Sequence, residues 1–374
     1  MATADFIVIG AGIAGASIAA ALAGEARVAL IEQEAHPGYH STGRSAAMYI
    51  TNYGPSDVRC LTHASGAFFR EPPDDFAGTA LVRKRGVLVI AGPGDESILD
   101  RMSREASVPV ERLTAQQARD LVPIIKPERV AAANYEPDAQ DIDVAALHQG
   151  FLRRARRAGA LVHLNARVQA TIRRRDGLWT VPTADGQEVS APVIVNAAGA
   201  WADEVAGAFG AAPIGLVPKR RTAVIIDGPT GYQIADWPMM NDARDTWYAR
   251  PEAGTKLMVS PIDATPTPPC DAAPEEWDIA VAIDRIQTDL DLTVRRVEHS
   301  WAGLRTFSPD GSLVIGPDPE VDGFFWLAGQ GGYGIQTSPA AADLARALLY
   351  GRDIPEPLRR AGVDPDAVAP ARFR

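Results

Sequence analysis

Residues 6–32 read FIVIGAGIAGASIAAALAGEARVALIE, and this stretch decides the fold of the chain. An apolar run, residues 6–9, meets glycines at the spacing GxGxxG, namely Gly10, Gly12 and Gly15, and an alanine-rich stretch and a second apolar run follow. The order predicts a strand, a tight turn, an amphipathic helix and a second strand, which is the βαβ unit that binds dinucleotides. The helix N-terminus in such a unit faces the phosphates with unpaired N–H groups and a favourable dipole.

The glycines and the acidic end of this stretch have separate expected roles. Gly10 permits the tight turn, Gly12 lets backbone N–H groups approach a pyrophosphate, and Gly15 lets the helix pack closely on the strand. Glu32 ends the second apolar run, about 20 residues downstream, and is expected to accept hydrogen bonds from a ribose. A signal anchor is the alternative, because residues 6–24 are uncharged over nearly the length of a bilayer span. The glycine spacing favours the nucleotide fold.

The composition is that of an ordinary globular protein. With 374 residues the chain is long for one core, which favours two domains. Its hydrophobic fraction is 46% and its charged fraction 22%. The formal net charge of −10 argues against nucleic-acid partners and an anionic membrane surface, because phosphate binding needs clustered positive charge. Contact with a membrane is therefore not indicated.

The cysteines and histidines indicate neither a disulfide framework nor a metal site. Cys60 and Cys270 form no CxxC pair, which favours a reducing compartment and predicts a cytoplasmic protein. The six histidines contain no HxxxH or HExxH spacing, so no metal is expected.

Further elements are predicted from periodicity, caps and turn signals. Helices are expected over residues 55–69, from about 95, from 114 to before Pro123, from 141 or 143 to 159, and over 274–290, with Trp277, Val281 and Ile286 in the core. Strands are expected over residues 82–91, 193–201, 222–226, 247–249, 256–260 and 324–328. Asp176-Gly177 and Asp185-Gly186 are hairpin turn signals, and the residues after Gly351 are expected to form a surface extension.

Two loops carry further signals. Residues 36–47, HPGYHSTGRSAA, form a polar loop that suits folding over a pyrophosphate or an isoalloxazine edge, although a solvated surface loop has the same composition. Residues 329–334, GQGGYG, join the strand at 324–328 to a helix, so a second helix N-terminus is aimed at the carboxyl edge of the sheet. Its dipole suits negative charge on a reduced flavin.

The motifs GAGIAG, HSTGRSAA, VNAAGAW, GLRTFSPDG, SLVIG and GQGGYGIQTS together resemble the flavin-dependent D-amino-acid oxidase family, over nearly the whole chain. Within that family the chain looks most like the bacterial D-arginine dehydrogenases, through PGYHSTGRSAA, DIDVAALHQGFLR, PKRRTA, WAGLRTF and QGGYGIQTS. The resemblance implies an FAD cofactor and hydride transfer from the α-carbon of a D-amino acid to flavin N5, after which water converts the imino acid to a 2-oxo acid and ammonia. It implies a small amino-acid substrate and leaves the electron acceptor unknown.

The resemblance also implies the fold class, α/β (α+β overall). The expected architecture is a glutathione-reductase-like FAD-binding Rossmann domain with a substrate domain built on an antiparallel or mixed sheet. We expect the FAD-binding domain to comprise residues 1–78, 142–212 and 302–374, and the substrate-binding domain residues 79–141 and 213–301. No cysteine lies in the C-terminal part of the chain, where sarcosine oxidase relatives attach the flavin covalently, so non-covalent FAD is expected.

Five positions match the family's reacting site. Arg221 in PKRRTA and Arg305 in GLRTF match arginines that bind the substrate α-carboxylate, a role that suits the planar guanidinium fork. Tyr53 and Tyr248 match tyrosines whose hydroxyls lie over the substrate, and the carbonyl of Gly332 matches one that accepts from its amine. From the residues alone, a solvated strand charge is the favoured interpretation of Arg220 or Arg221, and a cross-strand aromatic that of Tyr248.

The resemblance places a larger set of residues at the FAD. Most of them lie in the glycine turn, in the loop 36–47 and in the GQGGYG loop. They are Gly10, Gly12, Ile13, Ala14, Gly15, Glu32, Gln33, Ser41, Thr42, Arg44, Ser45, Ala46, Ala47, Val168, Ala198, Gly199, Trp201, Gly303, Gly331, Gly332, Tyr333, Gly334, Ile335, Gln336 and Thr337.

One region departs from the D-arginine dehydrogenases. Their strand that corresponds to residues 86–89 carries a glutamate for the distal cation of the substrate, and the alignment places Val87 there, with Met48 at a histidine and Ile50 at a threonine. An unpaired buried guanidinium costs several kcal/mol, roughly two decades of affinity or more, so D-arginine is not the expected substrate. We expect Met48, Ile50, Val87 and Met239 to line a pocket for an apolar or otherwise uncharged side chain.

Other functions stay open on the sequence alone. The arginine pair would also serve an N-methyl amino acid, glycine or a 2-hydroxy acid, because each carries a carboxylate. A nicotinamide-only dehydrogenase would not need the GQGGYG loop. An inactive flavin-binding subunit is the non-enzyme alternative, since the pocket residues have changed.

Overall fold

The N-terminal βαβ unit forms at the predicted residues. In this computed structural model, which describes residues 2–168, 173–182, 186 and 188–374, β2 (Phe6–Ile9) and β3 (Val28–Ile31) pair in parallel and α1 (Ile13–Leu22) joins them. Gly10 has a positive φ of 96°. A Cβ on Gly15 would lie 1.7 Å from the carbonyl oxygen of Gly10. Both positions therefore require glycine.

β2 lies inside the first sheet, which is buried on both faces. Phe6 and Val8 pack into one core and Ile7 and Ile9 into the other. Strands covered on both faces read as continuous apolar runs, and the sequence of β2 has that form. In spatial order the strands of the first sheet are β10 (Leu161–His163), β3, β2, β14 (Val193–Asn196), β21 (Phe324–Ala328) and β20 (Val314–Pro317), with β20 antiparallel to β21.

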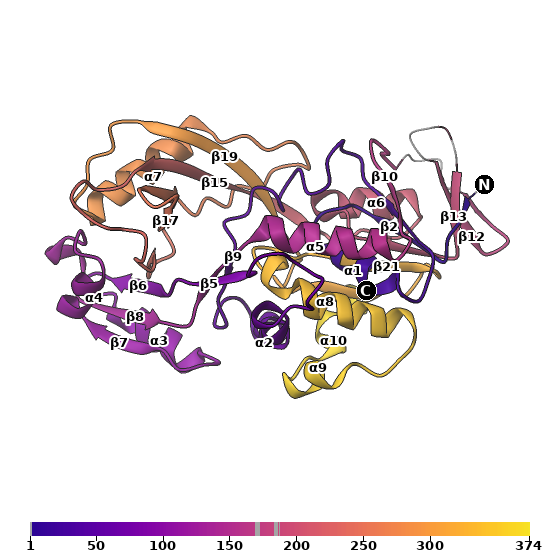
Figure 1. Ribbon diagram of the computed structural model, residues 1–374, viewed down its shortest axis with the longest axis horizontal. Coiled ribbons are helices and arrows are strands. Elements are labelled where there is room, and N and C mark those ends of the chain that lie inside the picture. Colours follow the sequence, from indigo (N-terminus) through magenta and orange to yellow (C-terminus); the bar gives the residue numbers. More distant parts are fainter. Residues whose placement is uncertain (1, 169–172, 183–185, 187) are drawn as a thin grey trace.

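Helices cover one face of the first sheet. They are α1, α2 (Ser56–Arg70), α5 (Val144–Arg157) and α8 (Gly334–Leu349), which lie close together in Figure 1. The prediction that α1 is amphipathic was wrong, because α5 and α8 both pack on it and bury almost every side chain of the helix. Small alanine side chains permit this close approach of three helices.

The other face of the first sheet is covered by α6 (Ala202–Ala208) and by a small meander. In spatial order the strands of the meander are β1 (Ala2–Thr3), β13 (Glu188–Ala191), β12 (Leu178–Pro182) and β11 (Arg173–Arg175). Asp176 and Gly177 both have positive φ and join β11 to β12, so this predicted hairpin turn is confirmed. The second predicted turn contains Asp185, which lies outside the described residues.

The second sheet forms the other lobe of the elongated molecule, and its two long strands reach back toward the first sheet (Figure 1). In spatial order its strands are β19 (Val297–Phe307), β15 (Val217–Asp227), β18 (Lys256–Ser260), β17 (Tyr248–Glu252), β16 (Met239–Asp242), β6 (Val87–Ala91), β8 (Ala132–Glu136) and β7 (Glu111–Thr114). The pairing is antiparallel except between β16 and β6. The architecture is thus the predicted Rossmann-like sheet plus a mixed sheet, and the domain boundaries stay a prediction.

The helix that packs on the second sheet corrects one core prediction. α7 (Glu276–Asp289) buries Ala282 and Ile286, but Trp277 is 75% exposed. Ile286 is confirmed as a core residue and Val281 is partly buried, whereas the tryptophan stands in the first turn on the outer side of the helix, so the prediction was wrong for Trp277. Two other helices are α3 (Glu96–Glu105) and α4 (Ala115–Leu121). α4 begins at the capping box of Thr114, where the sequence predicts a helix start. Two 3₁₀ turns are η1 (Pro127–Arg129) and η2 (Gly199–Trp201).

The single strand predicted over residues 82–91 is two strands. β5 (Val82–Lys84) joins a small sheet with β4 (Met48–Tyr49) and β9 (Gln140–Ile142), whereas β6 belongs to the second sheet. Gly86, with a φ of 77°, breaks the run, because that backbone conformation cannot continue a strand. Two of the connections between the two large sheets, the one into β6 and the one out of β8, therefore pass through this small sheet.

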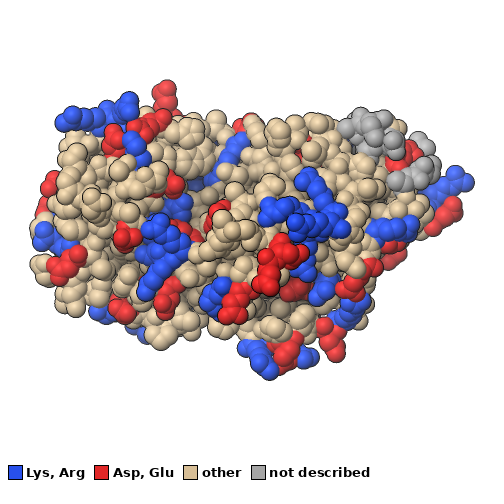
Figure 2. All heavy atoms as spheres, in the orientation of Figure 1, with Lys and Arg blue, Asp and Glu red and all other residues tan. Residues whose placement is uncertain are grey.

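The C-terminal segment is packed structure, not the predicted surface extension. It forms α9 (Glu356–Arg360), α10 (Pro365–Val368) and η3 (Pro370–Phe373). Leu358 and Val368 are each 1% exposed in the core beside α2 and β20, and the Arg372 guanidinium donates to the carbonyl of Leu313 at 2.9 Å. Among the described helices, none has both the length and the apolar character needed to span a membrane. Figure 2 shows charges of both signs interspersed over one face.

We expect Leu358→Ala to lower the free energy of unfolding by about 2–5 kcal/mol, because it leaves a cavity in the first core. Urea unfolding of the purified protein measures this. Leu161→Ala removes a leucine side chain that is 53% exposed and should change stability by no more than about 0.5 kcal/mol. Equal effects of the two variants would mean that the C-terminal segment contributes no core.

Candidate active site and cofactor cavity

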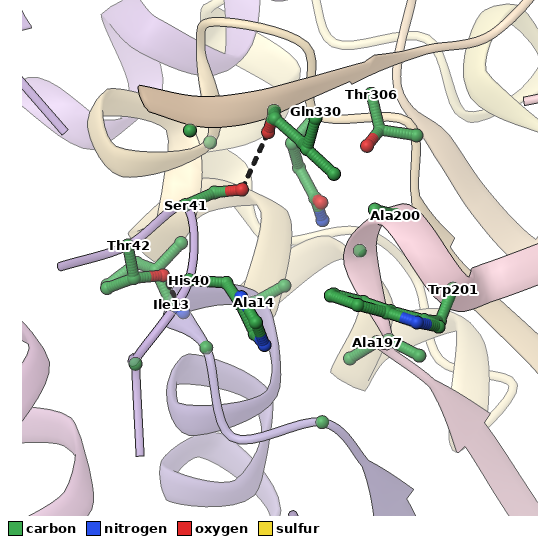
Figure 3. Close-up of a pocket in the computed structure, with 18 of the residues that line it drawn as sticks. Ile13, Ala14, His40, Ser41, Thr42, Ala197, Ala200, Trp201, Thr306 and Gln330 are labelled. Carbon is green, nitrogen blue, oxygen red and sulfur yellow. Dashed lines mark hydrogen bonds between the residues drawn. The ribbon is translucent and has the colours of Figure 1, made fainter. Parts of the chain in front are cut away.

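A cavity of about 560 Å³ opens where the carboxyl edge of the first sheet meets the long strands of the second. Its walls come from the turn after β2, the loop 38–46, the segment 197–208, the inner ends of β15 and β19, and the segment 330–335. Figure 3 shows Ser41 and Thr42 on one side of the cavity, with Trp201 opposite and Gln330 above. Open α/β sheets bind their ligands at this edge.

The N-terminus of α1 forms one end of the cavity. Gly12 occupies the N-cap position and has no side chain that could cap the helix. The hydroxyl of Thr42 accepts the Ile13 N–H at 2.9 Å, and the Glu32 carboxylate accepts the Ala11 N–H at 2.7 Å. Free helix donors and the dipole make this end suitable for an anion.

The loop 36–47 is held to the second sheet by hydrogen bonds. The Ser41 hydroxyl donates to the Leu304 carbonyl at 2.6 Å, which is the dashed line in Figure 3. The Arg44 guanidinium donates to the carbonyls of Ala272 and Ala302 and pairs with Asp271. The guanidinium of Arg44 therefore holds the loop in place, although the residue lines the cavity.

Strand alternation separates the two neighbouring arginines of β15. Arg220 is buried on one face, 7% exposed, and pairs with Asp278 at 3.1 Å. Arg221 faces the cavity, and its Nε donates to the carbonyl of Asp263 at 2.8 Å. Successive side chains of a strand point to opposite faces, so only one of the two can reach the cavity.

Arg221 and Arg305 share the cavity face of the β15–β19 pair. Gly303 lies directly across from Arg221, and Lys219 across from Arg305, so the two arginines are diagonal neighbours. Among the described residues, no carboxylate forms an ion pair with either guanidinium. Burial lowers the pKa of Arg221, and the positive charge of Arg305 lowers it further. This arrangement is suited to an anion in the cavity.

The hydroxyl and carbonyl groups beside the arginines come from other elements. The Arg305 Nη1 donates to the Tyr53 hydroxyl at 3.2 Å. A Cβ on Gly332 would lie 2.8 Å from that hydroxyl and 3.0 Å from the same guanidinium nitrogen, so the glycine gives them room. Burial raises the pKa of Tyr333 to about 12, so this phenol stays neutral. Tyr248, on β17, is buried and lines the cavity.

The structure brings most predicted site residues to this one cavity. Those that line it are Gly10, Gly12, Ile13, Ala14, Glu32, Gln33, Ser41, Thr42, Arg44, Ser45, Ala46, Val168, Ala198, Gly199, Trp201, Arg221, Tyr248, Gly303, Arg305, Gly331, Gly332, Gly334 and Ile335. The predicted residues that do not line it are Gly15, Ala47, Tyr53, Tyr333, Gln336 and Thr337. Gln336, for example, is buried and bonds to the backbone of Ile50 and to Thr62.

The four predicted pocket residues pack together but do not line this cavity. Met48 and Val87 are buried in one apolar cluster, with Ile50 and Met239 packed against it. Met239 also contacts the cluster that contains Tyr248, so the group lies behind the arginine end of the cavity. Their role toward a substrate stays a prediction.

Several cavity residues were missed by the sequence analysis. His40, Arg167, Glu204, Thr306 and Gln330 all line the cavity. The His40 Nε2 lies 2.9 Å from a Glu34 carboxylate oxygen, and its ring packs on Trp201 at 4.6 Å. The places of His40, Thr306 and Gln330 in the motifs HSTGRSAA, GLRTFSPDG and GQGGYGIQTS were usable signals, whereas Arg167 and Glu204 carry no local pattern.

The profile of the DAO family, described as FAD dependent oxidoreductase, matches residues 5–348. The chain belongs to this family. The DAO family and its FAD cofactor, both predicted from the sequence, are thereby confirmed.

The cavity residues fit FAD. The N-terminus of α1, where Gly12 supplies no side-chain cap, suits a pyrophosphate, and the Glu32 carboxylate, 8% exposed at the cavity wall, suits a sugar hydroxyl. A Cβ on Gly12 would lie 3.2 Å from the Thr42 hydroxyl, so glycine there keeps the passage between α1 and the loop open.

The chain is similar in sequence to glycine oxidase and dimethylglycine dehydrogenase and in fold to a solved glycine oxidase. It is 27% identical over 390 residues to glycine oxidase of Pseudomonas aeruginosa, covering 98% of both chains. It is 27% identical over 239 residues to mitochondrial dimethylglycine dehydrogenase of Rattus norvegicus, covering 59% of this chain and 27% of that protein. The crystal structure of glycine oxidase from Geobacillus kaustophilus superposes with a TM-score of 0.82 at 22% identity, covering 94% of this chain and 96% of that one, which confirms the fold class.

These relatives do not single out D-arginine dehydrogenases, so that finer likeness stays a prediction.

We expect Glu32→Gln to weaken FAD binding by about tenfold or more, because a charged acceptor is lost at the turn and at the ribose. The dissociation constant of FAD for the apoprotein, from quenching of flavin fluorescence, measures this. Glu204→Gln removes a negative charge from the wall of the same cavity and serves as the control, with an expected change below about twofold. Equal affinities for wild type and Glu32→Gln would exclude the ribose role.

Proposed function

We propose that the protein catalyses FAD-dependent oxidative deamination of a D-amino acid with an apolar or otherwise uncharged side chain. The observation that carries the proposal is the pair Arg221 and Arg305, two guanidinium groups that face the cofactor cavity and form no ion pair with a carboxylate of the described residues. The charge of the Asp263 carboxylate acts on Arg221 from beyond ion-pair distance. A bound α-carboxylate would supply the missing charge through bidentate contacts. The D configuration is supported by the sequence resemblance described above.

The residues of the chain bind and orient the substrate, and bound FAD supplies the hydride acceptor. The two arginines hold the carboxylate, the Tyr53 hydroxyl is fixed by Arg305 at 3.2 Å, and the Gly332 carbonyl is available to the amine. The neighbouring positive charges favour the neutral amine over the ammonium, because like charges disfavour the protonated form. A neutral amine is what loss of hydride from Cα requires, and fixing the carboxylate orients that C–H bond.

The expected side-chain preference rests on the apolar cluster. Met48, Ile50, Val87 and Met239 pack together beside the arginine end of the cavity. None of these side chains can neutralise a distal cation, so a guanidinium or ammonium buried there would be costly. We keep a reducing, cytoplasmic setting and non-covalent FAD as parts of the proposal, since Cys60 and Cys270 are free.

A second candidate is oxidation of another carboxylate-bearing amine or of a 2-hydroxy acid. The named activities of the P. aeruginosa and rat relatives, glycine oxidase and dimethylglycine dehydrogenase, favour it. The arginine pair would serve these substrates equally well. Oxygen, a quinone or a carrier protein is the electron acceptor to be tested, and an inactive flavin-binding subunit is the outcome if no substrate reduces the flavin.

We expect a panel of substrates to discriminate these candidates. Anaerobic bleaching of the flavin should be fastest with D-methionine, D-leucine or D-phenylalanine and slower by about 100-fold or more with D-arginine and D-lysine, for lack of a counter-charge. Glycine, sarcosine and D-lactate test the second candidate. A clear preference for D-arginine or D-lysine would contradict the proposed pocket.

We expect Arg305→Met to retain FAD but to raise KM by at least about tenfold, because a charge-assisted contact to the carboxylate is lost. Steady-state kinetics with the best substrate and the flavin absorbance of the purified variant measure the two effects. Lys84→Met removes an exposed cation on β5, outside the cavity lining, and should leave KM unchanged. Unaltered turnover of Arg305→Met at low substrate would exclude the clamp.

A further inference from the structure

His148 lies at the cofactor turn although it is far from it in sequence. The residue belongs to α5 and is 4% exposed. Its Nε2 lies 2.9 Å from the carbonyl oxygen of Ala11, which is 137 residues away along the chain. The motif that contains it, DIDVAALHQGFLR, has no function assigned by the site described above. The site described above therefore gives no role to this buried imidazole behind the glycine turn.

The Ala11 backbone is fixed at both of its polar groups. Its N–H donates to the Glu32 carboxylate at 2.7 Å, and its carbonyl accepts from His148. The Ala11–Gly12 peptide is trans, so the carbonyl of Ala11 and the N–H of Gly12 point in opposite directions. A donor that holds this carbonyl toward α5 therefore directs the Gly12 N–H away from α5. Gly12 lines the cavity at the start of α1, where the pyrophosphate is expected.

The other edge of the imidazole contacts the second cofactor loop. A Cβ on Gly38 would lie 2.8 Å from Cε1 and 3.1 Å from Nδ1 of His148, and Gly38 itself lines the cavity. One ring thus packs between the glycine turn and the loop 36–47. An apolar side chain of similar size would fill this volume, but it would leave the buried Ala11 carbonyl without its donor. Burial lowers the pKa of His148, so the ring is neutral, and its N–H at Nε2 is the hydrogen that Ala11 accepts.

We propose that His148 is a positioning residue for FAD, which aims the Gly12 N–H at the pyrophosphate by holding the Ala11 carbonyl. The residue touches neither the substrate nor the reacting atoms. Its loss should therefore act on cofactor affinity and leave the chemistry of the loaded enzyme intact.

Three variants test this role through the FAD dissociation constant of the apoprotein. His148→Leu keeps the volume and removes the donor, and should raise the dissociation constant by about tenfold or more. His148→Gln places an amide N–H near the position of Nε2 and should stay within about threefold of wild type. His148→Asn places its amide near the position of Nδ1. This side chain is too short to reach the Ala11 carbonyl, so the variant should behave like His148→Leu. The comparison of Gln with Asn decides the question if the leucine variant does not fold.

Phe151→Leu is the matched control. It changes apolar packing on the same buried face of α5, where Phe151 packs with Phe68 and Phe76, without altering a polar group. It should lower the Tm of the apoprotein and leave the FAD dissociation constant unchanged, whereas His148→Leu should raise the FAD dissociation constant as well as lower the Tm. At saturating FAD, kcat and KM of His148→Leu should match wild type. Unchanged affinity in His148→Leu, or equal affinity of the Gln and Asn variants, would overturn the proposal.

Discussion

Two like charges held on one face of a strand pair are the constraint on which the rest of the site depends. The ladder between β15 and β19 places Arg221 and Arg305 as diagonal neighbours, and their hydrogen-bond partners among the described residues are a backbone carbonyl and a phenol. Repulsion between cations grows as water is excluded, so an anion in the cavity would stabilise the pair. The glycines at 303 and 332 leave the space that this anion and the cofactor need.

The parts of the fold that depend on local backbone constraints could be predicted from the sequence. The turn at Gly10, the capping box at Thr114 and the hairpin at Asp176-Gly177 each follow from residue types whose φ or side-chain bond admits few alternatives. Family resemblance added the residues that share no local pattern, including Trp201 and Gly303, and the cavity brings these together.

The parts that depend on long-range pairing could not be predicted. Whether Arg220 or Arg221 reaches the cavity is decided by the orientation of β15 against β19, which no local pattern reports. Arg44 stands in a loop that suits phosphate, yet its guanidinium is taken up by groups more than 220 residues away. Trp277 shows the same limit for a helix, because an amphipathic pattern leaves the burial of residues near the helix start undecided.

The order of the strands in the first sheet has a consequence for how the protein is made. β14, which ends at Asn196, lies beside β21, which begins only at Phe324, and the strands β15 to β19 of the second sheet lie between them in sequence. A ribosome must therefore release most of the chain before the cofactor sheet can close. Until then β14 is an unpaired edge of the sheet, a state that is prone to aggregation.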